Sequence, residues 1–169
     1  MKLHGPITVN GREYSAGAEV PWTFIYPFFL IHMAAFGGSG FLMAYAFDAP
    51  PEFLFMHGGI AIFVYLVFYL AIFGLDEVKW MFVNAGLGLF GIVSQIDWIL
   101  SLFGKHFGDF PVAVHVIPFL YFVLYTFLIR HAVVDFFGAR EDQVKRRRVE
   151  YGYVGTLLAV FSISHLLGA

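Results

Sequence analysis

Residues 22–47 read WTFIYPFFLIHMAAFGGSGFLMAYAF, an apolar and aromatic run that contains no Asp, Glu, Lys or Arg. A helix needs about 20 consecutive apolar residues to cross the hydrocarbon core of a bilayer. Proline is tolerated near the start of a helix, so Pro27 does not argue against a helix here. The run therefore predicts a membrane-spanning helix.

Further apolar runs follow at residues 53–73, 80–103, 110–136 and 151–168. Only 13% of the residues are charged, whereas about a quarter are charged in an ordinary soluble domain. Lipid must therefore surround most of the surface. We predict an all-α integral membrane protein in which residues 21–169 form a single bundle of five transmembrane helices.

The segment before the first span, residues 1–20, is polar and rich in glycine. Within it, ITVNGREY at residues 7–14 places Asn10-Gly11 between two short runs that favour strands, and Asn-Gly is the pair preferred in tight hairpin turns. The segment lacks the apolar core of a cleavable signal peptide. We predict a small β-hairpin at the cytoplasmic face of the membrane.

Positive charge is distributed unequally between the two sides of the predicted bundle. Nine of the ten Lys and Arg residues fall on the side of the N-terminus, and Lys105 alone falls on the other. Cytoplasmic loops of membrane proteins carry such an excess. We expect a bacterial inner-membrane protein with its N-terminus in the cytoplasm and its C-terminus outside.

Four ionisable residues from four different spans are predicted to lie at similar depth, in the outer third of the membrane. They are His57, Asp97, His115 and His165. Ionisable groups inside lipid are costly, so several of them at one depth indicate a functional site. His32 lies near the middle of the first span, and a hydrogen bond inside the bundle is its expected role.

Three chemistries fit this layer. His57 and His115 could be the axial ligands of a b-type haem, with Gly58 and Gly59 leaving room for the flat macrocycle. All four residues together could bind zinc, iron or copper, although the H-x-x-x-H and H-E-x-x-H spacings of such sites are absent. The third chemistry is a proton or ion relay in which Asp97 titrates.

The third predicted helix carries a stripe of residues at helical spacing. Its members are Asn84, Gly88, Gly91, Gln95 and Trp98. We interpret this stripe as a surface that faces other parts of the bundle.

Small and aromatic residues predict further packing features. Small residues in the first span, which include Gly37, Gly38 and Gly40, predict close helix packing inside the bundle or at a subunit contact. The tyrosine pairs 65/69 and 121/125 are candidates for lining a quinone or pigment pocket, with helix packing as the alternative.

We expect an inner-membrane protein whose outer-leaflet cluster binds haem or a metal ion and serves redox chemistry or electron transfer. Two alternatives stay open: a non-catalytic structural subunit of a larger membrane complex, and a proton-coupled transporter. The expected partners are the lipid bilayer, a quinone, and further copies of the chain or other membrane subunits, but not nucleic acid. The sequence does not name a substrate or a reaction.

Overall fold

The computed structural model describes residues 1–9, 11–47 and 49–166, and the side chains at 161 and 164–166 lie outside the described part. Its helices are α1 (Trp22–Tyr45), α2 (Pro51–Phe73), α3 (Leu75–Leu87), α4 (Leu89–Ser101), η1 (Phe107–Asp109, a short 3₁₀ helix), α5 (Val112–Phe136) and α6 (Gln143–Leu166). Its strands are β1 (Ile7–Val9) and β2 (Arg12–Tyr14).

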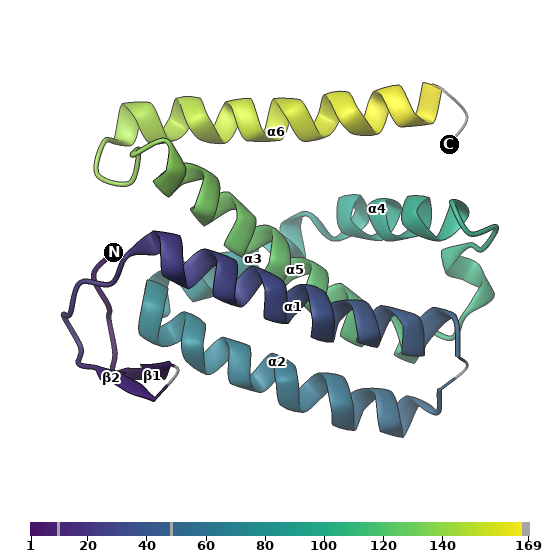
Figure 1. The fold of residues 1–169 in the computed structure, drawn as a ribbon. Coiled ribbons are helices and arrows are strands. Elements are labelled where there is room, and N and C mark those ends of the chain that lie inside the picture. Colours follow the sequence, from purple (N-terminus) through teal and green to yellow (C-terminus); the bar gives the residue numbers. More distant parts are fainter. Residues whose placement is uncertain (10, 48, 167–169) are drawn as a thin grey trace.

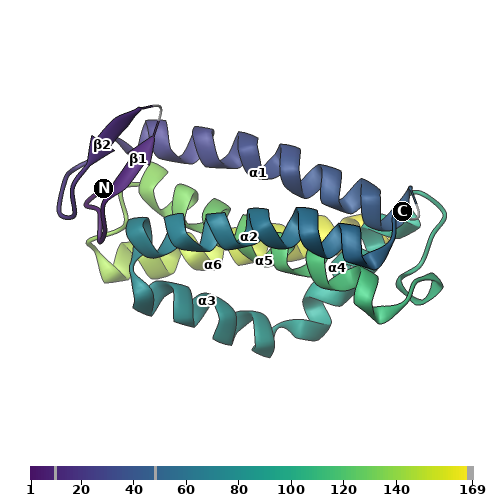
Figure 2. The same ribbon diagram turned by 90° about the horizontal axis from the view of Figure 1, so that it is seen from below.

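The long helices run back and forth between two ends of the molecule (Figure 1). From the end that holds the N-terminus, α1 runs outward, α2 returns, α3 and α4 run outward, α5 returns, and α6 runs outward again. Figure 2 shows the hairpin beside the N-terminus at one end, and Figure 1 shows that α6 ends at the other. This alternating order agrees with the order of the five apolar runs in the sequence.

Within the described residues, three helices are long and apolar enough to cross a membrane by length and composition: α1, α2 and α5. The pair α3 and α4 adds a fourth if it counts as one bent span. Helix α6 begins eight residues before the predicted fifth span, in the polar and basic segment from Gln143 to Glu150, and it does not pass the same test. Several apolar helices are thus compatible with a membrane protein, but the count of five spans is not confirmed.

The N-terminal hairpin is confirmed. Strands β1 and β2 pair antiparallel, with Ile7 opposite Tyr14 and Val9 opposite Arg12. Gly11 has a φ of 73°, in the left-handed region that glycine enters without steric cost. The chain before the hairpin is attached to the end of α2, because the N–H groups of His4 and Gly5 donate to the carbonyl of Ala71.

The third predicted span, residues 80–103, differs from the structure in its start and its shape. The helical segment begins at Leu75, directly after Gly74 ends α2 with a φ of 85°. It then breaks at Gly88, where α3 and α4 meet at 73°. Glycine weakens the interior of a helix, which makes Gly88 a suitable place for the break.

Helix α5 is the centre of the bundle, and it packs against each of the other long helices. Helix α5 packs tightly on α1 at two of the small residues predicted for close packing. A Cβ atom added at Gly37 would lie 3.2 Å from Cδ1 of Tyr121, and one added at Gly40 would lie 3.5 Å from Cε2 of the same ring. Absence of a side chain at both glycines lets the Tyr121 ring pack directly on the α1 backbone.

Candidate functional site

His115 lies in the first turns of α5 and is buried, with 4% of its surface exposed. Its Nδ1 shares a hydrogen bond of 2.8 Å with the hydroxyl of Tyr45 on α1. The ring of Phe107 stacks on the imidazole with 3.5 Å between the ring centroids. Within the described residues, Nε2 has no hydrogen-bond partner. His115 is therefore packed among aromatic rings.

His57 of α2 is half-buried and has a different set of neighbours. Its Nε2 lies 3.3 Å from the Ser39 hydroxyl of α1, and the Phe53 ring lies roughly parallel to it. The adjacent Gly58 does not leave open space, because a Cβ atom there would lie 2.3 Å from Cγ2 of Ile117. Ile117 of α5 thus fills the room that the haem hypothesis assigned to a macrocycle beside Gly58, whereas Gly59 has open space next to it.

Asp97 of α4 is tied to the connection before α5. Its carboxylate accepts a hydrogen bond of 2.6 Å from the backbone N–H of Phe107 and lies 3.8 Å from Nδ1 of His106. In the described part of the chain, no hydrogen bond or ion pair joins Asp97 to His57 or His115. The visible role of this carboxylate is to hold η1 in place.

The predicted four-residue metal site remains untested as a whole, because the side chain of His165 lies outside the described residues. Among the residues that are described, no group of three His, Asp or Glu side chains could hold a metal ion. The structure therefore does not bring the other three members, His57, Asp97 and His115, together as a metal centre. Haem ligation by the two histidines stays a prediction.

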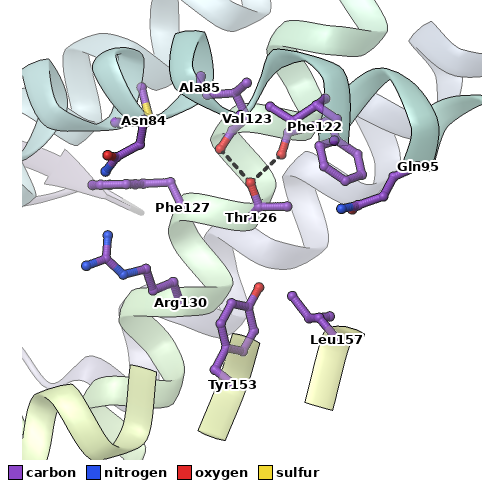
Figure 3. Close-up of a pocket in the computed structure, with 14 residues that line it drawn as sticks. Asn84, Ala85, Gln95, Phe122, Val123, Thr126, Phe127, Arg130, Tyr153 and Leu157 are labelled. Carbon is purple, nitrogen blue, oxygen red and sulfur yellow. Dashed lines mark hydrogen bonds between the residues drawn. The ribbon is translucent and has the colours of Figure 1, made fainter. Parts of the chain in front are cut away.

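A groove lies between the α3–α4 segment, α5 and α6, and Figure 3 shows residues that line part of it. It consists of adjoining cavities of about 370 Å³ and about 500 Å³. They share the lining residues Gly91, Gln95, Phe122, Thr126, Tyr153 and Leu157. The two cavities are therefore parts of one elongated space.

The stripe predicted on the third helix lines this groove. Asn84, Gly88, Gly91 and Gln95 line the smaller cavity, and Gly91, Gln95 and Trp98 line the larger one. The prediction that these residues share one face is confirmed across the break at Gly88. Two of the five are glycines, so part of the wall is bare backbone and the neighbouring space stays open.

Three polar side chains that line the smaller cavity have no side-chain hydrogen-bond partner among the described residues. Asn84 of α3, Gln95 of α4 and Tyr153 of α6 form no side-chain hydrogen bond within the part of the chain that the structure describes. Figure 3 shows Gln95 and Tyr153 directed toward the space beside Thr126, whose own hydroxyl donates to the Phe122 carbonyl at 2.8 Å. These three side chains therefore have hydrogen-bonding groups that a molecule in the groove could use.

A chain of ion pairs lies at the end of the groove nearest the basic loop. Arg130 of α5 donates to Glu150 of α6 at 2.6 Å, and Arg146 donates to the same carboxylate at 3.1 Å. Arg146 also donates to Glu77 of α3 at 3.3 Å, and Nε2 of His131 lies 3.6 Å from the other Glu77 oxygen. The two arginines and the two glutamates balance each other in charge.

A second charged cluster lies at the same end of the molecule. Asp135, buried near the end of α5, accepts hydrogen bonds from Arg140 at 2.5 and 2.6 Å and from the Tyr26 hydroxyl at 2.5 Å. Neither of these two clusters was identified from the sequence. The pairing signal in the sequence is weak, because the pairs that join different helices are 20 to 109 residues apart along the chain. They include Arg130 with Glu150, Glu77 with Arg146, and Tyr26 with Asp135.

No family model, curated protein or solved structure matches the chain.

Proposed function

We propose that the protein is an integral membrane protein that binds an elongated, uncharged lipophilic molecule in the groove between the α3–α4 segment, α5 and α6. The observation that carries this proposal is the groove itself, lined by the one stripe of Asn84, Gly88, Gly91, Gln95 and Trp98. We propose that this molecule takes part in membrane redox chemistry or electron transfer.

Several features support the membrane assignment. Apolar side chains cover the outside of the helices, and Ile31 of α1, Phe63 of α2 and Val112 of α5 are each more than 65% exposed. Helix order places the segments that carry nine of the ten Lys and Arg residues at one end of the molecule. By the positive-inside rule this end belongs in the cytoplasm, as the sequence predicts for a bacterial inner-membrane protein.

The size and walls of the groove support a lipophilic ligand. Cavities of about 300–1,000 Å³ with mainly apolar walls and a few polar groups are typical of small-molecule sites. The larger cavity, of about 500 Å³, is lined by aliphatic side chains from three helices, among them Ile99, Ile129 and Leu158. An aliphatic chain fits such walls. Among the polar side chains, Gln95 and Tyr153 line both cavities, and Asn84 lines the smaller one.

The test is to extract the protein, purify it in a mild detergent, and measure its bound lipophilic molecules by mass spectrometry. In Gly91→Phe, the new ring enters the groove, because a Cβ atom at Gly91 meets nothing within 4 Å. Gly86→Phe is the matched control, since a Cβ atom at Gly86 also meets nothing within 4 Å and Gly86 does not line the groove.

We expect the parent protein and Gly86→Phe to retain one lipophilic species in constant ratio to protein, and Gly91→Phe to lose it. Equal retention in the two variants, or no such species in the parent protein, would contradict the proposal. We expect both variants to fold, because replacing glycine inside a helix removes a destabilising residue.

Binding of b-type haem, zinc, iron or copper at the outer layer stays a separate prediction from the sequence. The unpartnered, buried Nε2 of His115 is the observation in its favour. A Soret band or bound metal in the purified protein, lost in His57→Ala and His115→Ala but kept in His32→Ala, is the expected result. Equal retention in the three variants would remove the assignment.

A further inference from the structure

Resting on the proposed function, we infer that the molecule in the groove is a quinone. Its carbonyl-bearing ring lies in the smaller cavity, near Asn84, Gln95 and Tyr153, and its apolar tail extends into the larger cavity past Trp98. The inference depends on the hydrogen-bond donors in the groove, on the charged residues at its end, and on the side chains that form its walls.

The three unpartnered side chains complement a quinone ring. The amides of Asn84 and Gln95 and the hydroxyl of Tyr153 each offer a hydrogen-bond donor. Carbonyl oxygens on opposite sides of a quinone ring only accept hydrogen bonds. The donors come from α3, α4 and α6 (Figure 3), so they approach the smaller cavity from more than one side, as a ring with two opposed acceptors requires.

Charge argues against an anionic lipid head group in the same place. Arg130 is the cation that lines the smaller cavity, and its guanidinium is already paired with Glu150 at 2.6 Å. The next cation, Arg146, is shared between Glu150 and Glu77. A phosphate would meet two carboxylates as well as two arginines there, so a neutral head group fits better.

The walls fit a flat ring followed by a chain. Phe122 and Tyr153 line both cavities, and Phe127 lines the smaller one. Aromatic side chains offer flat faces against which a planar ring stacks. The larger cavity adds Trp98 and Tyr125 as well as the aliphatic side chains of Ile99, Ile129 and Leu158. The aliphatic part of this wall suits an isoprenoid or alkyl tail.

Binding can be measured in lipid nanodiscs by the quenching of tryptophan fluorescence with a decyl-substituted benzoquinone. Trp98 lines the larger cavity, and a Trp98→Phe variant shows how much of the signal comes from the groove. Decylbenzene, which has the ring and chain but no carbonyl groups, serves as the competitor. Phosphatidylglycerol in the nanodisc serves as the competitor with an anionic head group.

We expect Asn84→Leu, Gln95→Leu and Tyr153→Phe each to weaken quinone binding by roughly twofold to tenfold, the range for loss of one hydrogen bond. Affinity for decylbenzene should stay unchanged in these variants, because they keep the apolar walls. Gly91→Phe should abolish binding of both probes.

Failure of the inference and failure of the proposed function give different results. If quinone and decylbenzene bind equally and the three polar variants have no effect, the groove binds lipophilic molecules but the quinone assignment is wrong. If phosphatidylglycerol displaces the quinone more strongly than decylbenzene does, an anionic lipid is the occupant instead. If neither probe binds, or Gly91→Phe changes nothing, the proposed function itself is wrong.

Discussion

Arg130 of α5 and Glu150 of α6 form an ion pair with 2.6 Å between Nη2 and Oε1. The side chains are 32% and 23% exposed, so solvent screens the pair only in part. Helix α6 packs mainly against α5. The position of α6 over the groove therefore depends on this pair and on Arg146, which binds the same carboxylate.

Replacing Glu150 should loosen the contact between α6 and α5. In Glu150→Gln, Arg130 and Arg146 lose a charged acceptor, and we expect the free energy of unfolding to fall by about 1.5–3 kcal/mol. Thermal unfolding of the purified protein measures this change. Asp76→Asn is the control, because the Asp76–Lys79 pair is 3.9 Å long and exposed. A similar loss in both variants would contradict a special role for Glu150.

The same carboxylate should make stability depend on pH in the acid range. Burial raises the pKa of Glu150, but hydrogen bonds from Arg130 and Arg146 lower it more, so the folded pKa lies below the ordinary value. The stabilising contribution is therefore complete above about pH 4.3, the unfolded pKa of glutamate, and is lost as the pH falls through the folded pKa. Thermal midpoints measured across this range should fall more steeply for the parent protein than for Glu150→Gln, and parallel curves would contradict this assignment.

The contact between Gly58 and Ile117 should make α2 sensitive to a single methyl group. A Cβ atom at Gly58 would lie 2.3 Å from Cγ2 of Ile117, so Gly58→Ala must displace α2 or α5, at a cost of about 1–3 kcal/mol. The neighbouring Gly59→Ala meets nothing within 4 Å and should be neutral or slightly stabilising. Chemical or thermal unfolding of the two variants provides the comparison; equal stability would show that the helices do not meet at this point.

The Asp135 cluster should depend strongly on its arginine. Asp135 is buried, and Arg140→Leu leaves its carboxylate with Tyr26 as its remaining side-chain hydrogen-bond partner. We expect a loss of about 3–5 kcal/mol, as for other buried pairs broken on one side. Asp135→Leu combined with Arg140→Leu should recover part of this loss, because no charge is then left buried. A double variant less stable than Arg140→Leu would contradict this explanation.

Composition and periodicity predicted the helical architecture, the hairpin and the shared face of the stripe from Asn84 to Trp98. These features depend on local sequence. The break at Gly88 was not predicted, because an isolated glycine in an apolar run is compatible with a straight helix as well as a bent one. The pairing of Arg130 with Glu150 was not predicted either, since it depends on how α6 lies on α5.

The predicted layer of ionisable residues shows what cannot be inferred from depth along a helix. Distance along a helix estimates how deep a side chain lies in the membrane, but not the direction in which it points. His57 meets Ser39 and Phe53, whereas His115 meets Tyr45 and Phe107. Similar depth therefore did not establish a common pocket for these two residues.

In the proposed membrane arrangement, the 73° break between α3 and α4 also affects how the chain fits a bilayer. A straight helix from Leu75 to Ser101 would measure about 40 Å at 1.5 Å per residue, whereas the hydrocarbon core is about 30 Å thick. Folding the segment at Gly88 shortens its reach along the membrane normal and so relieves hydrophobic mismatch without a large tilt of the whole segment. A substitution that straightened this segment would force its ends toward the polar head groups.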